Sequence, residues 1–130
     1  MQYGVKYTYT VQAFFKSGVN VTLGSYSEKG LTQVRTSGVP ELVSAEASGS
    51  GIRVSWKSAF GANGYLLYRK VVGTSKWTRV AVLKGNKSVV YQDTAAQRGV
   101  SYVYTARSFR VVSGKKIYST YDAKGVAGSY

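Results

Sequence analysis

The sequence contains no cysteine and no histidine, and only five of its 130 residues are acidic. Without cysteine the chain has neither a disulfide nor a thiolate nucleophile, and without histidine it lacks the usual imidazole base and zinc ligand. The carboxylates are dispersed, and none sits beside another at the spacing of a metal-binding loop. We therefore expect no catalytic residue, no metal and no cofactor. The acidic residues are Glu28, Glu41, Glu46, Asp93 and Asp122.

Long apolar runs and helix-forming segments are also scarce. No run approaches the roughly 20 apolar residues of a membrane-spanning helix, so we expect no membrane span. The chain has one proline but 15 glycines and 12 tyrosines, a balance that favours strands and turns. A chain of 130 residues can bury one core of ordinary size.

The sequence repeats itself once and incompletely. Residues 4–30 align without a gap on residues 99–125, at a constant offset of 95 that pairs Gly4 with Gly99 and Tyr26 with Tyr121. Such self-similarity is typical of tandem modules. Because the first copy has no counterpart of residues 39–98 before it, we expect residues 1–36 to be the C-terminal strands of a preceding repeat. We then expect residues 37–130 to be one complete domain and the chain to be a piece of a longer protein.

Hydrophobic residues alternate with polar ones through most of the complete copy, which is the pattern of half-buried strands. Turn residues separate these segments, as at Asn63-Gly64 and Gly85-Asn86. Seven short strands without a helix indicate an antiparallel β-sandwich. The expected strands are residues 41–47, 51–56, 65–70, 77–83, 89–93, 100–111 and 115–121.

Four motifs carry a family resemblance: Ile52-x-Val54-x-Trp56, Gly64-Tyr65-x-Leu67-Tyr68-Arg69, Tyr91-x-Asp93 and Gly99-x-x-Tyr102-x-Tyr104-x-Ala106. Together they resemble the fibronectin type III domains that occur as repeats in bacterial extracellular proteins. The resemblance implies an all-β, immunoglobulin-like antiparallel β-sandwich, with Trp56 in the core and Tyr102 forming a corner near the start of the sixth strand. It also implies a secreted or cell-surface location. It says little about function, because this fold serves many unrelated roles.

Alternation also predicts an outer face. If Tyr102 and Tyr104 point inward, then Arg107 and Phe109 stand outside on the same strand, and Tyr68 stands outside on its neighbour. We take Tyr68, Arg107 and Phe109 as the candidate ligand-binding face. Two interpretations remain open: an apolar patch rimmed by charge can bind a partner, or Lys and Arg stems can simply cover the aromatic rings. The complete expected patch is Leu66, Tyr68, Val103, Arg107 and Phe109.

The chain is strongly basic, with 18 Lys and Arg and a net charge of +13. Such a surface attracts polyanions at low salt, but high charge can also just keep a repeat array soluble. The cations do not form one block and no recognition motif is present, so we expect no sequence-specific nucleic-acid binding. For a secreted module, a cell-wall polymer or a glycan is the more natural partner.

Two functions follow from these patterns. The first is a non-catalytic module of a larger secreted or cell-surface bacterial protein, acting as a spacer or interaction domain. The alternative is a module that binds carbohydrate or an anionic cell-wall polymer. A lone hairpin at residues 4–30 is marginal in water, so we expect it to pack either on an edge of the complete domain or, by strand exchange, in a homodimer, and we favour the homodimer. In the parent protein the expected partners are the neighbouring repeats.

Overall fold

The computed structural model describes residues 3–9, 12–17, 20–26 and 31–130. The chain divides into two compact units, Met1–Arg35 and Thr36–Tyr130. Every regular element in the described residues is a β-strand, and they include no helix. The all-β composition predicted from the period of two is confirmed.

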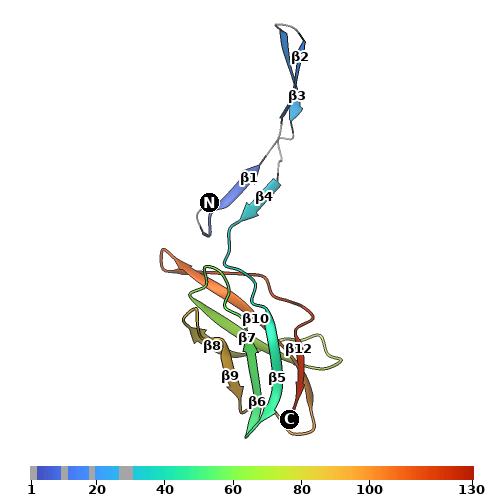
Figure 1. The fold of residues 1–130 in the computed structure, drawn as a ribbon, viewed down its shortest axis with the longest axis vertical. Coiled ribbons are helices and arrows are strands. Elements are labelled where there is room, and N and C mark those ends of the chain that lie inside the picture. Colours follow the sequence, from blue (N-terminus) through green and yellow to red (C-terminus); the bar gives the residue numbers. More distant parts are fainter. Residues whose placement is uncertain (1–2, 10–11, 18–19, 27–30) are drawn as a thin grey trace. The chain divides into compact units, whose positions relative to one another are not determined.

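The second unit is an antiparallel β-sandwich (Figure 1). Its three-stranded sheet has the order β5-β6-β9, and its five-stranded sheet has the order β11-β10-β7-β8, with β12 also paired to β10. Because β12 pairs with the first residues of β10 and β11 with the last, both lie on the same side of this long strand. The strands are β5 (Leu42–Ser48), β6 (Gly51–Trp56), β7 (Gly64–Val71), β8 (Thr78–Lys84), β9 (Val90–Asp93), β10 (Ser101–Val112), β11 (Lys115–Tyr118) and β12 (Val126–Ser129).

One hydrophobic core joins the two sheets. On β6, Ile52, Val54 and Trp56 alternate inward and the intervening Arg53 is exposed, as the sequence pattern predicted. Trp56 is 2% exposed, and its indole meets the Tyr65 ring edge to face with the ring centres 5.7 Å apart. The opposite sheet contributes Tyr65, Leu67, Tyr102, Tyr104 and Ala106.

A buried ion pair links the sheets at one end of the core. Asp93, at the end of β9, is 1% exposed, and its Oδ2 accepts hydrogen bonds from Arg69 Nη1 at 2.6 Å and from the Tyr104 hydroxyl at 2.7 Å. Burial, the hydrogen bond to Asp93 and the charge of Asp93 all raise the pKa of Tyr104 well above its ordinary value. Burial alone would lower the pKa of Arg69, but the hydrogen bond and charge of Asp93 raise it. The phenol and guanidinium therefore both remain donors at neutral pH.

Tyr102 forms the corner that the family resemblance implied. Its hydroxyl accepts a hydrogen bond from the backbone N–H of Gln97 at 3.0 Å, five residues upstream. The Arg69 guanidinium lies 4.8 Å from the centre of the Tyr102 ring. This corner therefore touches the same arginine that forms the ion pair between the sheets.

The end of the chain differs from the expected single strand over residues 115–121. Strand β11 stops at Tyr118, and residues 119–125, here called the crossing segment, separate it from an unexpected strand, β12. The crossing segment is fixed to β10 because the Ser119 hydroxyl accepts from Ser108 N–H at 3.0 Å and the Thr105 hydroxyl donates to Asp122 O at 2.7 Å. Gly125, at φ +59°, returns the chain so close to Tyr104 O that a Cβ would clash.

The first unit consists of two strand pairs. Strand β1 (Lys6–Tyr9) pairs with β4 (Leu31–Val34), and β2 (Gln12–Ser17) pairs with β3 (Asn20–Tyr26). With 95 added to each number, the β1–β4 pairs and the β2–β3 pairs from Phe14–Leu23 to Ser17–Asn20 match pairs of the second unit. Thus Lys6 faces Val34 as Ser101 faces Ser129, and Ser17 faces Asn20 as Val112 faces Lys115. The Gln12–Tyr26 pair has no counterpart, because β11 stops at Tyr118.

Truncation of the core tryptophan tests the packing of the sandwich. We expect Trp56→Ala to lower the free energy of unfolding by roughly 3–5 kcal/mol, because a large buried side chain is lost and a cavity remains. Trp56→Phe should cost less, since the indole N–H has no hydrogen-bond partner to lose. Urea unfolding measures both. Val72→Ala, at a half-exposed surface position, is the control and should change stability by less than about 0.5 kcal/mol.

The ion pair between the sheets gives a second prediction. Asp93→Ala leaves Arg69 partly buried without its partner, so we expect a loss of about 3 kcal/mol or more in unfolding free energy. Tyr104→Phe removes only one hydrogen bond to the same carboxylate and should cost about 1–2 kcal/mol. Equal losses in the two variants, measured by urea unfolding, would contradict the assignment of the main role to the charge pair.

Candidate functional site

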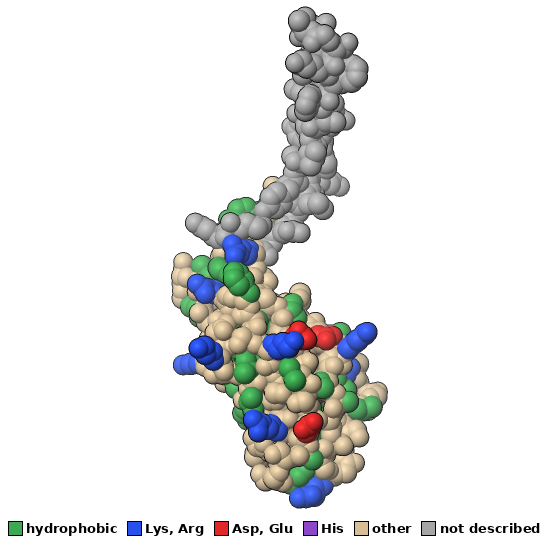
Figure 2. Space-filling view, viewed as in Figure 1, with side chains coloured by type: hydrophobic (Ala, Val, Ile, Leu, Met, Phe, Trp, Pro, Cys, Tyr) green, Lys and Arg blue, Asp and Glu red, His purple; other side chains and the backbone are tan. Residues whose placement is uncertain are grey.

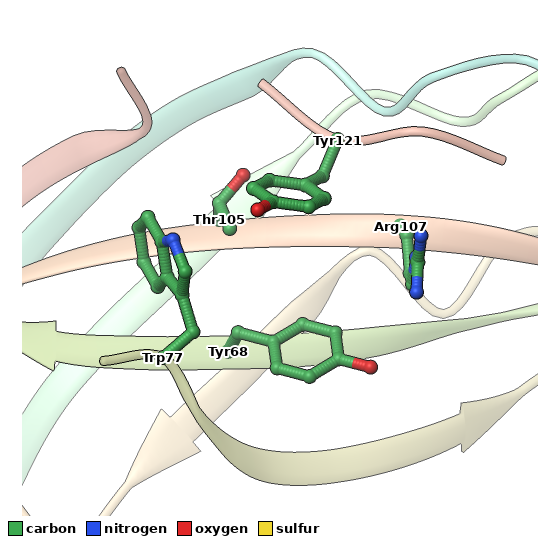
Figure 3. Close-up of a pocket in the computed structure, with 5 residues that line it drawn as sticks. All are labelled: Tyr68, Trp77, Thr105, Arg107 and Tyr121. Atoms are coloured by element: carbon green, nitrogen blue, oxygen red, sulfur yellow. The ribbon is translucent and has the colours of Figure 1, made fainter. Parts of the chain in front are cut away.

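A cleft of about 180 Å³ lies on the outer face of the five-stranded sheet, turned away from the core. Figure 3 shows Tyr68 and Tyr121 on opposite sides of β10, Trp77 at one end of the cleft and Arg107 at the other. Tyr68 comes from β7, and Trp77 precedes β8 by one residue. The lining residues are Tyr68, Trp77, Thr105, Arg107 and Tyr121.

Strand register brings the floor of the cleft together. Thr105 on β10 is paired with Tyr68 on β7, and Arg107 is paired with Leu66. Paired residues in an antiparallel ladder project from the same face, so Tyr68, Thr105 and Arg107 all stand outward once Tyr104 and Ala106 are in the core. Tyr68 and Arg107 therefore point outward, as the alternation predicted, and Thr105 points outward with them.

The wall opposite Tyr68 comes from the crossing segment. The Thr105 hydroxyl binds Asp122 O, and Arg107 Nε donates to Ser119 O at 3.1 Å. These two bonds hold the segment alongside β10 on either side of Tyr121. The Tyr121 ring, 41% exposed, thus stands above the sheet instead of lying flat within it.

Aromatic rings and cations alternate around the cleft. Trp77 and Tyr121 meet edge to face, with ring centres 6.0 Å apart and planes inclined by 75°, a favourable geometry for aromatic pairs. Lys70 Nζ lies 4.7 Å from the Trp77 ring centre. The Arg107 guanidinium carbon lies 5.7 Å from the Tyr121 ring centre and 5.6 Å from that of Tyr118. Such contacts are worth about 0.5–1 kcal/mol each at exposed sites.

The electrostatic character of the cleft is positive. Arg107 forms no ion pair with a described carboxylate, and no acidic side chain lines the cleft. The nearest acid in sequence, Asp122, directs its Oδ1 to the backbone N–H of Lys124 at 2.9 Å. The cleft can therefore receive an anionic group beside a flat ring.

Two members of the expected outer patch are buried. Phe109 is 3% exposed and Leu66 is also buried, so they are not available as an open surface. The Phe109 ring packs beside Gly64, meets Tyr118 edge to face at 6.5 Å, and is covered by Lys116 Nζ at 4.7 Å from its centre. Tyr68 and Arg107 line the cleft, and Phe109 lies outside it.

Sequence reasoning missed Trp77 and Tyr121 as site residues. Both fall in segments expected to be strands, where alternation alone does not bring them to Tyr68. The sequence signal that the two residues share is that each is a large aromatic residue next to a turn or a strand end. Tyr121 is also one of the positions that are identical between the two copies.

Neither a metal-binding cluster nor a membrane-spanning helix occurs in the described part of the chain. No group of three or more acidic residues there could hold a metal ion. None of its elements is a helix long and apolar enough to cross a membrane. The buried titratable cluster of Asp93, Arg69 and Tyr104 lies between the sheets, and Arg69 and Tyr104 both donate hydrogen bonds to the Asp93 carboxylate.

No protein-family model matches the chain, and no curated protein matches it. Among solved structures, it is similar to a crystal structure of an Fn3-like protein from Clostridium thermocellum. The two share 26% sequence identity, with a TM-score of 0.53 over 70% of this chain and 90% of that chain. With two antiparallel sheets around one core and a tyrosine corner, the chain contains an all-β sandwich of the fibronectin type III-like fold.

Proposed function

We propose that the chain is a non-catalytic module of a larger multidomain secreted or cell-surface bacterial protein, where it serves as a spacer or interaction domain. Residues 37–130 form the complete domain, and residues 1–36 are the C-terminal strands of the repeat before it. The observation that carries this proposal is the repeated strand register. Apart from the Gln12–Tyr26 pair, the four strands described in the first unit pair in the register that the last strands of the second unit adopt.

Contacts around the strands repeat as well. Gly4 N–H donates to Arg35 O at 2.8 Å, and 95 residues later Gly99 N–H donates to Tyr130 O at 2.9 Å. The Arg35 guanidinium covers the Tyr3 ring at 4.4 Å, whereas Arg98 covers the Tyr130 ring at 4.2 Å. The cation and the ring have exchanged places while the contact has been kept, which supports descent of both units from one repeat.

The chemistry of the chain supports a non-catalytic role. The sequence has no cysteine or histidine. Of the acidic side chains that the structure describes, Asp93 is buried in an ion pair and Glu41 pairs with Lys57 at 3.3 Å. Neither is set beside a second carboxylate for acid–base work.

Removing the first unit tests the module boundary. If residues 1–36 belong to another repeat, then residues 37–130 alone should unfold cooperatively. Their free energy of unfolding, extrapolated to water, should lie within about 10–15% of that of the full chain, which is the error of the extrapolation. Loss of cooperative unfolding in residues 37–130 would contradict the boundary.

Hydrogen exchange on the full chain completes this experiment. In the second unit, residues 102–104 pair with both β7 and β12, whereas among the described residues β1 pairs only with β4. We expect fast exchange in β1, since an isolated pair is marginal in water. Sedimentation at several protein concentrations gives the fraction of chains that are dimeric. If the hydrogen-exchange protection of β1 increases with this fraction, the partner of β1 is a strand-exchanged second copy of the chain and not a neighbouring repeat.

The cleft favours a second candidate function, binding of carbohydrate or an anionic cell-wall polymer. Net charge is +13, and Figure 2 shows Lys and Arg side chains spread over the visible face of the second unit. Spread charge attracts polyanions without selecting among them. The cleft adds a local arrangement of rings and a guanidinium that charge alone does not provide.

Retention on purified bacterial cell wall tests this candidate. Wild-type protein should be retained at low salt and in part at high salt, because screening weakens spread charges more than a cleft contact. The Tyr68→Ala/Arg107→Ala double variant should lose the salt-resistant part. If high salt abolishes retention equally in the wild-type protein and the double variant, the binding is charge attraction alone. If neither protein is retained at low salt, the polymer-binding candidate is wrong and the spacer role remains.

A further inference from the structure

We propose that the cleft binds one uronate residue of an acidic polysaccharide, with its ring against the aromatic walls and its carboxylate on Arg107. The inference rests on the polymer-binding candidate described above and names the class of its ligand. The strand pattern alone does not specify this cleft, because two of its three aromatic rings, those of Trp77 and Tyr121, come from outside the regular strands.

The size and shape of the cleft suit a single sugar unit. Its volume of about 180 Å³ is below the roughly 300–1,000 Å³ of pockets that enclose whole small ligands. The cleft runs along β10, from Trp77 to Arg107, with Tyr68 on one side and Tyr121 on the other (Figure 3). A polymer can lay one ring there while its neighbours continue along the sheet surface.

The walls select a ligand that has a flat apolar face. Tyr68, Trp77 and Tyr121 are all partly exposed in the cleft, and pyranose rings present C–H groups that pack against aromatic carbons. Tyr and Trp each combine an apolar ring with a polar tip, so they can also hydrogen-bond to ring hydroxyls. A phosphate polymer without sugar rings would gain nothing from these walls.

The charge selects a carboxylate over a neutral group. Arg107 Nε is held by Ser119 O, which fixes the guanidinium and leaves its terminal nitrogens as donors. A planar guanidinium binds a carboxylate through two parallel hydrogen bonds. The second cation, Lys70, sits at the opposite end over Trp77, and the acidic side chains described elsewhere are occupied or lie on the other sheet.

Tryptophan fluorescence provides a local readout. Of the two tryptophans, Trp56 is buried in the core and Trp77 lines the cleft. Galacturonate tetramer should therefore protect the wild-type protein from quenching by acrylamide, and this protection should vanish in Trp77→Phe. The methyl ester of the same tetramer keeps the rings but neutralises the carboxylates, so we expect its affinity to fall about tenfold or more. Inorganic polyphosphate should give no protection of Trp77.

Matched variants separate the cleft from general charge. Arg107→Gln and Tyr121→Ala should each weaken tetramer binding about tenfold. Arg53→Gln removes the same charge from an exposed position on β6, in the other sheet, and should leave affinity within about twofold. Thermal unfolding checks that each variant is folded. If Arg107→Gln is unstable through the loss of its Ser119 contact, Arg107→Lys and Tyr121→Ala still decide the matter.

Three results would overturn the inference: equal affinity for the acid and its ester, equal effects of Arg53→Gln and Arg107→Gln, or no change in Trp77 fluorescence at saturating tetramer. Retention on cell wall without a tetramer effect would leave polymer binding standing and refute the uronate site. Failure of the 37–130 domain to fold would instead refute the module boundary. The two proposals therefore fail by different measurements.

Discussion

The buried contact of Asp93 with Arg69 and Tyr104 is the constraint on which the rest of the sandwich depends. A carboxylate that is taken out of water must be paired and hydrogen-bonded, and here its partners come from β7 and β10 of the opposite sheet. The requirement fixes which residues of these strands face inward. Because side chains alternate along a strand, Tyr68, beside Arg69, and Thr105, beside Tyr104, must then face outward. The same contact that closes the core thus sets the floor of the cleft.

The crossing segment turns a flat sheet face into a site. A sheet of alternating side chains gives a row of rings and cations, as on many solvated surfaces. Ser119 and Asp122 accept hydrogen bonds from Arg107 and Thr105, so the chain that leaves the ladder after β11 stays beside β10 and holds Tyr121 opposite Tyr68 (Figure 3). Gly125 allows its return because any larger residue would clash with the β10 backbone. Arg107, at the end of the cleft, therefore supports the cleft wall through Nε and leaves its terminal guanidinium nitrogens as donors for a ligand.

The two units show how strand register can persist while side chains change. Lys6–Val34 and Ser101–Ser129 share a position in the ladder but no chemistry. Backbone hydrogen bonds do not depend on side-chain identity, so pairing survives substitution wherever turns and spacing are kept. The exchange of Tyr3 and Arg35 for Arg98 and Tyr130 fits the same rule, because a ring and a cation attract each other whichever strand end carries each.

The sequence alone determined the all-β class, the approximate place of every strand of the second unit except β12, and the inward faces of β6, β7 and β10. It also determined the core position of Trp56 and the outward positions of Tyr68 and Arg107. All of these follow from a period of two and local turn signals, which are short-range properties of the chain. Tertiary structure decided that Phe109 is buried beside Gly64 and that Trp77 and Tyr121 reach the same cleft. Those outcomes depend on contacts between residues distant in sequence, such as Thr105 with Asp122. Alternation fixes the side of a sheet on which a residue lies, but only packing fixes what covers that side.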